Sequence, residues 1–436
     1  GYLVRDVTVF TADPAQPLIH HADVHIDDDV IVELSSERLE VRGARVIDGQ
    51  GKTLLPGLVD SHVHVTGAMI IPWNLATPPT LDFTLKAALY SGITTIVDMS
   101  GWSTQRMNQL ADQLATGQRL GPHLIHVGMG FTGPGSHPVP YREFIRSTLA
   151  PPFRPFVPQL VHEVANPDDF GELDAHLAAG GRLTKIFVDR IPPTAPLMSD
   201  DILCALVARS HAAGVGVIAH IGANSDVRSV LDAGGDGLVH GVYKERMEDG
   251  LARDIHDRGV FVIPTMVVFE TYHLFDNVHD YTHYSDLERL TTHAAKWRAL
   301  QDPHPVDKPE VWDEGDAAVA DGVSHLHANT ADLHAAGITL LAGSDSPNMG
   351  LTLGGSLHEE LEHLVAAGLT PTEALLSATS VPAATWSELT GQERTYGTIE
   401  PGMRADLLLV RGDPTTDIEA TQQIEEVFLA GQRLRR

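Results

Sequence analysis

Apolar and polar residues alternate over short segments at both ends of the chain. The pattern is clear in YLVRDVTVFT near the start and in IEEVFLAGQRL near the end, and Pro, Asp and Gly residues separate such segments. Alternation with a period of two is typical of β-strands that bury one face. The two ends therefore predict one small β-sandwich domain, made of residues 1–55 and 397–436.

The pattern changes in residues 56–396, where nearly continuous apolar segments alternate with helical ones. Such segments, rich in β-branched residues, indicate parallel strands covered on both faces by helices. Eight of them can be counted, which is the number that a closed (β/α)8 TIM barrel requires. An open, doubly wound α/β sheet is the alternative, but it does not need eight strands that mostly end in polar residues. The segments are 57–64, 94–100, 123–129, 183–189, 216–221, 237–242, 261–268 and 338–345.

Two connections between the predicted strands are unusually long. Residues 131–167 contain many Pro and Gly residues, and residues 269–321 contain many aromatic and His residues. Long connections in a compact domain are usually lids or binding loops, so substrate specificity is expected there.

Composition narrows the classes of partner. The formal charge of −28 argues against nucleic acid or an anionic membrane surface, because both require a basic patch. No stretch of roughly 18 or more apolar residues is present, so no membrane-spanning helix is predicted. Cys204 is the only cysteine, and the N-terminal residues lack the pattern of a signal peptide, so a cytoplasmic location is the simplest expectation.

The stretch LPGLVDSHVH, Leu55 to His64, introduces candidate chemistry at the end of the first predicted barrel strand. Residues two apart on a strand share a face, so His62 and His64 project the same way, with Asp60 on that face too. Two explanations are open at this point. These side chains either form a solvated polar face or hold a metal ion.

Other predicted strands also carry polar residues near their carboxyl ends, and all these ends meet at one face of a barrel. Besides His62 and His64, these residues are Lys185, His220, His240 and Asp345. A single His in such a place is more often a hydrogen-bonded structural residue, and Asp345 within GSDS could simply cap a helix. Together, four His and one Asp have no comparable structural explanation, because unpaired polar groups there would cost folding energy. Imidazole and carboxylate are the ligands that Zn²⁺ takes.

Lys185 lies within an apolar strand of a chain that has few lysines. An ordinary ammonium group would be repelled by a divalent cation. An amine that has reacted with CO₂ is instead an anionic carbamate, which can bridge two metal ions. The alternative is that Lys185 points outward or pairs with Asp189 on the same strand.

These stretches resemble the amidohydrolase superfamily, near its imidazolonepropionase-like and Xaa-Pro dipeptidase (prolidase-like) branch. The resemblance covers nearly the whole chain, in family order. It implies a (β/α)8 barrel flanked by a β-sandwich that both ends of the chain form. The matching stretches are LLPGLVDSHVH, GITTIVDM, GPHLIHVG, TKIFVD, VIAHIG, DGLVHG, FVIPTMV, LLAGSDS, GGSLHEELEHLVAAGLTPTEALLSATSVPA and GTIEPGMRADLLLVRGDP.

The resemblance also implies a binuclear metal centre, with Zn²⁺ as the expected ion. In this arrangement His62, His64 and Asp345 hold one ion, and His220 and His240 hold the second. N6-carboxylated Lys185 lies between the two ions.

The implied reaction is hydrolysis of a carbon–nitrogen bond in a small molecule, such as an amide, peptide, urea or carbamate. A metal-bound hydroxide is the expected nucleophile, with Asp345 as general base and His240 as the other catalytic residue. His137, Tyr272 and His273 are candidates for substrate contacts. A homo-oligomer stays open, because relatives often form one and the sequence marks no interface.

Two other functions compete with this one. A mononuclear centre of His62, His64, His220 and Asp345 would suit a ring hydrolase or a deaminase. Deaminases of the superfamily resemble one another in a Glu three residues after the third His, a place that Ala223 takes here. A metal-free binding or assembly protein on the same fold is less expected, because every ligand position is filled.

One acidic segment, LHEELEHLVAAGL, is interpreted as structural. His358, Glu359 and Glu360 are consecutive on a predicted amphipathic helix and cannot share one face. We therefore expect no metal site at these three residues.

Overall fold

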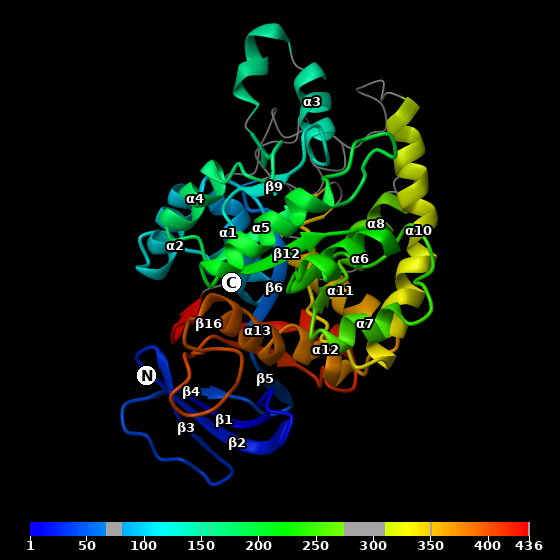
Figure 1. The fold of residues 1–436 in the computed structure, drawn as a ribbon. Coiled ribbons are helices and arrows are strands. Elements are labelled where there is room, and N and C mark those ends of the chain that lie inside the picture. The colour runs from blue at the N-terminus through cyan, green and yellow to red at the C-terminus, as the bar shows by residue number, and fades with distance from the viewer. Residues whose placement is uncertain (67–80, 149, 158, 274–309, 349–350, 435–436) are drawn as a thin grey trace.

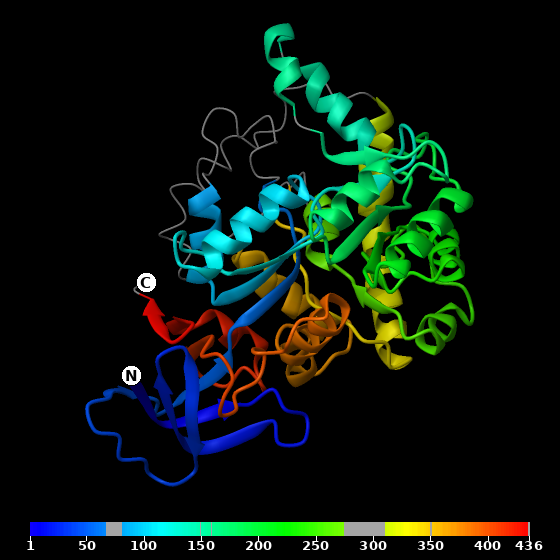
Figure 2. The ribbon, with the colours of Figure 1, turned by 60° about the vertical axis from the view of Figure 1, so that its left-hand side comes forward.

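The computed structural model describes residues 1–66, 81–148, 150–157, 159–273, 310–348 and 351–434. Two sheets of parallel strands and their helices form the larger part of the molecule, and a third sheet lies below them in Figures 1 and 2. None of the helices in these ranges is both long and apolar enough to cross a membrane.

The third sheet is shared by the two ends of the chain. Its order is β17-β16-β15-β5-β1-β2-β3, with β4 paired to β1, and antiparallel pairing of β5 with β15 joins the two ends, from Lys52 opposite Arg411 to Pro56 opposite Leu407. The strands are β1 (Tyr2–Phe10), β2 (Leu18–Asp27), β3 (Val30–Ser35), β4 (Arg45–Asp48), β5 (Lys52–Pro56), β15 (Leu407–Arg411), β16 (Ile424–Leu429) and β17 (Gln432–Leu434).

A single continuous sheet accounts for all these described strands. The expectation that both ends build one β unit is thereby met. The two-layer sandwich and the boundaries 1–55 and 397–436 stay predictions.

The remaining strands are parallel and belong to two sheets. One has the order β6-β7-β8 and the other the order β10-β9-β11-β12-β13-β14. The first contains β6 (Leu58–Val63), β7 (Ile93–Asp98) and β8 (His123–His126). The second contains β9 (Gly130–Thr132), β10 (Val161–Glu163), β11 (Leu183–Phe187), β12 (Gly216–His220), β13 (Gly237–Val239) and β14 (Phe261–Ile263).

The eighth predicted barrel strand, residues 338–345, is not a regular strand. Leu340 makes an isolated parallel bridge to Val262 of β14, and Ser346, the residue just after the segment, makes one to Val63 of β6. Asp345 has a φ of 56°, a left-handed conformation that extended strands do not accommodate. The segment thus links the two parallel sheets on one side, whereas no ladder joins β8 to the six-stranded sheet among the described residues. The structure shows parallel α/β architecture, and barrel closure is not shown.

Side chains from the parallel strands nevertheless converge on a shared core. One buried cluster takes Val59 from β6, Val97 from β7, Ile218 from β12 and Ile263 from β14, and packs them with Trp386. The indole Nε1 donates to Ser61 Oγ at 3.2 Å, which ties the helix of Trp386 to β6. Apolar side chains from both parallel sheets therefore share one packed core with Trp386.

The helices surround these sheets, as Figures 1 and 2 show. Helix α3 and the short 3₁₀ helix η3 project on the side away from the third sheet, which the two ends of the chain share. Helix α10 runs along one flank. The helices are α1 (Leu81–Tyr90), α2 (Thr104–Ala115), α3 (Val139–Thr148), η3 (Pro151–Phe156), α4 (Gly171–Ala178), α5 (Asp200–Ala212), α6 (Asn224–Ala233), α7 (Leu251–Asp257), α8 (Met266–His273), α10 (Glu310–Ala335), α11 (Gly355–Ala366), α12 (Pro371–Ser377), α13 (Ser380–Thr390) and η6 (Ile418–Gln422).

Candidate metal centre

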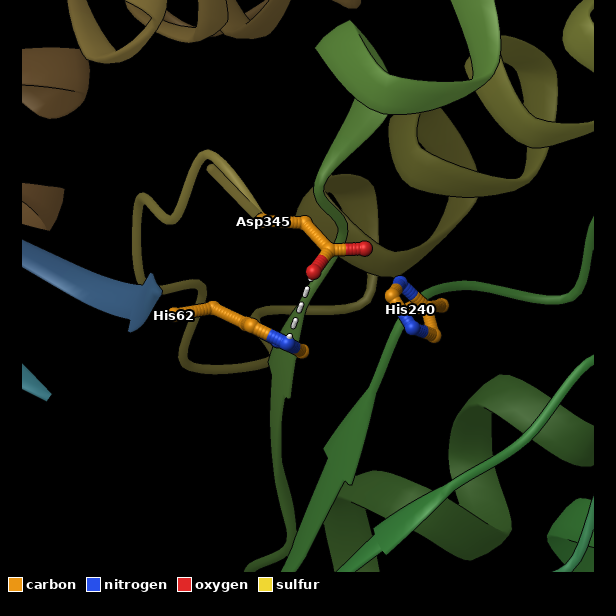
Figure 3. Close-up of side chains that lie close together, drawn as sticks. All are labelled: His62, His240 and Asp345. Atoms are coloured by element: carbon orange, nitrogen blue, oxygen red, sulfur yellow. Dashed lines mark ion pairs between the residues drawn. The ribbon is translucent and has the colours of Figure 1, made fainter. Parts of the chain in front are cut away.

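The structure brings side chains from β6, from the residue that follows β13 and from the 338–346 segment into one buried group. His62, His240 and Asp345 each offer a ligand atom, and these atoms all lie within 4.8 Å of one another. Figure 3 shows the three side chains pointing toward a common space, with Asp345 between the two imidazoles. Residues from three separate elements therefore meet where the strand ends were expected to meet.

His62, His64 and Asp345 form the tighter part of this group. The Nε2 atoms of His62 and His64 are 3.2 Å apart, and each is 3.2 Å from Asp345 Oδ1. Ligand atoms bound to one tetrahedral zinc ion at ~2.0–2.1 Å would be separated by roughly 3.3 Å. The three atoms thus have the spacing that a single divalent ion requires.

A backbone contact fixes the imidazole of His64. Its Nδ1 lies 3.0 Å from the carbonyl oxygen of Ser100, and since a carbonyl can only accept, Nδ1 carries the proton. The Nε2 atom then presents a lone pair toward His62 and Asp345. Outer contacts of this kind are what orient metal-binding imidazoles.

His220 and His240 form the other part. His240 Nε2 and His220 Nδ1 are 3.1 Å apart, and their outward nitrogens contact Thr265 Oγ1 at 2.5 Å and Asp189 Oδ2 at 3.3 Å. The carboxylate of Asp189 can only accept, so His220 Nε2 carries the proton. Thr265 Oγ1 is a hydroxyl that can accept or donate, so the roles of the His240 ring nitrogens depend on the tautomer. We assign the proton of His240 to Nδ1, the tautomer that leaves its Nε2 free to bind a metal ion beside His220 Nδ1.

For His64, burial opposes the charged form, but contacts with Asp345 and Asp98 outweigh it and raise the pKa above its ordinary value. Burial favours the neutral form of the other three imidazoles. It lowers the pKa of His62 to about 3 and that of His240 well below its ordinary value, an effect to which neighbouring His220 adds. For Asp345, burial opposes ionisation, but His62 and His64 outweigh it and hold the pKa well below its usual range. Neutral imidazoles and an ionised carboxylate are the forms that bind metal ions.

Lys185 is fully buried in the middle of β11, and its Nζ has no hydrogen-bond partner among the described residues. Burial lowers the pKa of this amine to about 7. The alternative pairing with Asp189 is not observed, because Asp189 accepts from Lys244 Nζ and from the hydroxyl of Tyr243 at 2.7 Å. An unpaired buried amine is costly, which is the signal expected of a side chain that has another chemical partner.

Several residues of the group have strained backbones. His240, Thr265 and Asp345 have φ values of 66°, 50° and 56°, and non-glycine residues in this left-handed region cost about 1–3 kcal/mol each. Such strain persists only where the surroundings impose it, and it is concentrated at functional sites.

Asp60 does not join the ligand atoms, although the strand period places it on their face. Its carboxylate accepts from the backbone N–H of His62 at 3.2 Å and from the N–H and hydroxyl of Ser344 at 2.9 and 2.6 Å. Burial raises the pKa of Asp60 to about 7. The residue therefore holds the backbone on both sides of the site, next to His62 and next to Asp345.

The three predicted substrate contacts have different outcomes. His137 lies beside the group, with its ring centroid 4.9 Å from that of His220 and 5.8 Å from that of Phe187. The side chains of Tyr272 and His273 lie outside the described part of the structure, so those two expectations stay predictions.

Several residues that support the site were not predicted from the sequence. Thr265 follows a strand within IPTMV, and Asp189 follows another within IFVD, so their positions at strand ends were a usable signal. Asp98 also ends a strand; its carboxylate accepts from the N–H of Val65 at 2.8 Å, just after the metal-ligand candidates of β6.

The structural interpretation of the acidic helix is consistent with the contacts observed there. His358 is buried and contacts Thr421 Oγ1 and the Ser91 carbonyl oxygen through its two ring nitrogens. Glu360 has a role that its sequence context did not reveal. Its Oε2 accepts from the N–H of Val267 at 2.8 Å, in the first turn of α8.

Comparison with known proteins places this arrangement in a family. The model of the amidohydrolase family matches residues 53–434. The chain is 32% identical over 91 residues to an enamidase of Eubacterium barkeri, covering 20% of this chain and 22% of that protein. It is 37% identical over 97 residues to adenine deaminase 2 of Shouchella clausii, covering 22% of this chain and 15% of that protein.

The crystal structure of a prolidase complexed with N-methylphosphonate-L-proline has a similar fold. The TM-score is 0.76 at 23% sequence identity, and the match covers 100% of this chain and 99% of the prolidase chain. Shared architecture thus extends over the whole length, whereas the sequence matches to the enamidase and the deaminase span less than a quarter of those proteins.

Replacing Thr265 tests the assignment of the His240 proton. Thr265→Val removes the hydroxyl but keeps the shape, so we expect metal affinity to fall by about 10–100-fold, the usual cost of losing an outer contact. Thr265→Ser keeps the hydroxyl and should bind metal nearly as tightly as the unaltered protein. Competition with a chelator measures both, and equal losses in the two variants would contradict the assignment.

Glu360 predicts a pH dependence of stability. Burial raises the pKa of Glu360 well above the ordinary 4.5, so the stability it contributes is fully present below that pH and is lost as the pH rises toward the folded value. Glu360→Gln cannot ionise. Between about pH 5 and pH 8 its free energy of unfolding should therefore decline less than that of the unaltered protein.

Denaturant titrations at several pH values measure this difference, and Glu359→Gln provides a matched control on the partly exposed neighbour. The control should follow the unaltered protein. A parallel decline in all three proteins would show that Glu360 is not protonated in the folded state.

Proposed function

This chain belongs to the amidohydrolase family, and from that premise we propose that it is a metal-dependent hydrolase that cleaves a carbon–nitrogen bond of a small molecule. The observation that carries the proposal is the convergence of imidazoles and one carboxylate, together with a buried lysine whose Nζ makes no hydrogen bond among the described residues. Neither a structural polar cluster nor a binding scaffold needs such an arrangement.

The donor set fits two divalent cations, with Zn²⁺ as the proposed ion. His62, His64 and Asp345 would hold one, and His220 and His240 the other. Lys185 would lie between them as a carbamate, formed when its neutral amine adds to CO₂ and releases one proton. Its depressed pKa of about 7 supports this step, because only the neutral amine reacts.

Bound divalent cations would polarise the substrate carbonyl and lower the pKa of water toward ~7. Asp345 is the group that would take a proton from the attacking water and return it to the leaving nitrogen. Water thereby adds to the carbonyl carbon, the carbon–nitrogen bond breaks, and an acid and an amine are released. The contact with Thr265 orients the His240 ring beside Asp345. In this proposal His240 therefore binds metal and helps to position the centre.

Hydrolysis of an amide-type bond is favoured over deamination of a ring. Ala223 occupies the place where the superfamily deaminases resemble one another in a Glu. Asp226 is the nearest acidic residue in the sequence, but its Oδ2 already accepts from the N–H groups of Gly222 and Ala223 at 3.0 and 2.8 Å. No carboxylate of this loop is therefore available to move a proton to a ring nitrogen.

The proposed substrate class is an amide, dipeptide, urea or carbamate with an apolar or aromatic portion. Phe187 lies beside His220, with ring centroids 5.5 Å apart, and Phe269 lies 5.5 Å from His240. Apolar walls next to a polar centre are typical of small-molecule sites. The substrate would enter at the carboxyl ends of the strands, as in closed (β/α)8 barrels, an architecture that we propose for residues 56–396.

Replacing Lys185 tests the binuclear centre. Elemental analysis of the unaltered protein, purified with bicarbonate, should find about two zinc ions per chain, and Lys185→Ala should lose at least about one of them, together with hydrolysis of a panel of amides, dipeptides and carbamates. Lys244→Ala provides a control lysine that contacts the outer residue Asp189 and the carbonyl oxygen of Arg190 and should retain more metal.

Each outcome of this experiment discriminates between functions. About one ion in both the unaltered protein and Lys185→Ala would contradict the binuclear mechanism and favour the mononuclear ring hydrolase. No bound metal in either protein would favour a binding or assembly role.

His137 gives a test of substrate contact. We expect His137→Asn to raise KM by about fivefold or more, which corresponds to losing one hydrogen bond in a buried site, while the metal content stays unchanged. His162→Asn is the control, because His162 is partly exposed and pairs with Glu172. Unaltered KM in His137→Asn would remove His137 from the substrate contacts.

A further inference from the structure

A second group of potential metal ligands lies outside the centre described above, where α8, α10 and α11 meet. Glu270 of α8, His327 of α10 and His363 of α11 each offer a ligand atom, and these atoms lie within 4.8 Å of one another. His327 Nε2 is 3.3 Å from Glu270 Oε1. The rings of His327 and His363 are 5.3 Å apart between centroids, in an edge-to-face arrangement.

The chemistry of this group is that of a transition-metal site. Two imidazoles and one carboxylate are a recurrent three-ligand set for Zn²⁺ and leave a fourth position for water. Imidazole nitrogens disfavour Ca²⁺ and Mg²⁺, which take oxygen ligands. The His327 Nε2 atom is itself buried, and its 3.3 Å contact with Glu270 Oε1 does not have the geometry of a hydrogen bond, although the side chain as a whole is 24% exposed. An ion could therefore reach the group from solvent and bind this nitrogen together with the carboxylate of Glu270.

Helix α8 connects this group to the main centre. Its first turn is held by Glu360 of α11, which accepts from the N–H of Val267. Phe269 packs against His240 with 5.5 Å between ring centroids, and Glu270 is the next residue along the helix. Thr265, which contacts His240, immediately precedes α8. An ion on Glu270 would fix α8 to α10 and α11 on one side, while Phe269 packs against His240 on the other.

We propose that Glu270, His327 and His363 bind one Zn²⁺ ion, separate from the proposed catalytic centre, that ties α8 to α10 and α11. The site needs neither Lys185 nor the ligands at the strand ends. It can therefore be tested even if the proposed catalytic centre is wrong.

The experiment uses the full chain with the main centre disabled by His62→Ala and His240→Ala. After equilibration with zinc and removal of unbound metal, this protein should retain about one ion per chain, and adding His327→Ala should remove it. Zinc should also raise the melting temperature of the first protein and leave that of the second unchanged, because only a ligand of the folded state stabilises it.

His334→Gln is the matched control. His334 lies on the same helix α10 and pairs with a glutamate at the same 3.3 Å, Glu373, but it belongs to no three-ligand group among the described residues. This change should leave the retained zinc in place. His363→Gln should remove it by a second route, and circular dichroism checks that each variant remains folded.

Equal zinc contents with and without His327 would overturn the proposal. So would a loss of zinc in His334→Gln as large as that in His327→Ala. Loss confined to the His327 and His363 variants would support it, whatever the unaltered protein shows in hydrolysis assays.

Discussion

Repulsion between converging lone pairs is the constraint on which the site depends. With protons on the outer nitrogens of His220 and His240, as assigned above, their inner nitrogens face each other at 3.1 Å. In a buried setting such contacts are unfavourable unless a positive charge lies between them. A divalent cation, as proposed above, would turn this repulsion into ligation, so the arrangement of the outer contacts favours a cation in the inner space.

The surrounding structure maintains this arrangement at a cost in backbone strain. Left-handed backbone at His240, Thr265 and Asp345 would relax in an unconstrained loop. It is held here by hydrogen bonds that reach across the strand ends. One is the N–H of Asp345 donating to the carbonyl oxygen of His62 at 2.8 Å, and another is Asp60 accepting from Ser344. The apolar cluster around Trp386 lies beneath and fixes the strands themselves.

The convergence of strand-end residues could be predicted from the sequence because it needs only strand periodicity and parallel order. His62, Lys185 and Asp345 were located in this way. The partners of these residues could not be found so easily. Asp189 was considered as a partner for Lys185 because both lie near one strand, but it binds Lys244 and Tyr243, more than 50 residues away in the chain. Such choices depend on tertiary packing, which periodicity does not encode.

The last strand illustrates a different limit. Residues 338–345 have the apolar pattern of a strand, yet Ser344 and Asp345 engage distant groups through side chain and backbone and bend the segment out of a regular ladder. Ser344 contacts both Asp60, far away in the sequence, and Ser346, two residues on, and side-chain hydrogen bonding of this kind competes with regular strand pairing. Glu360 follows the same logic in α11, where it appeared to be one more acidic residue on a helix. Its buried carboxylate caps α8, the helix that follows Thr265, so a residue remote in sequence helps to set the position of His240.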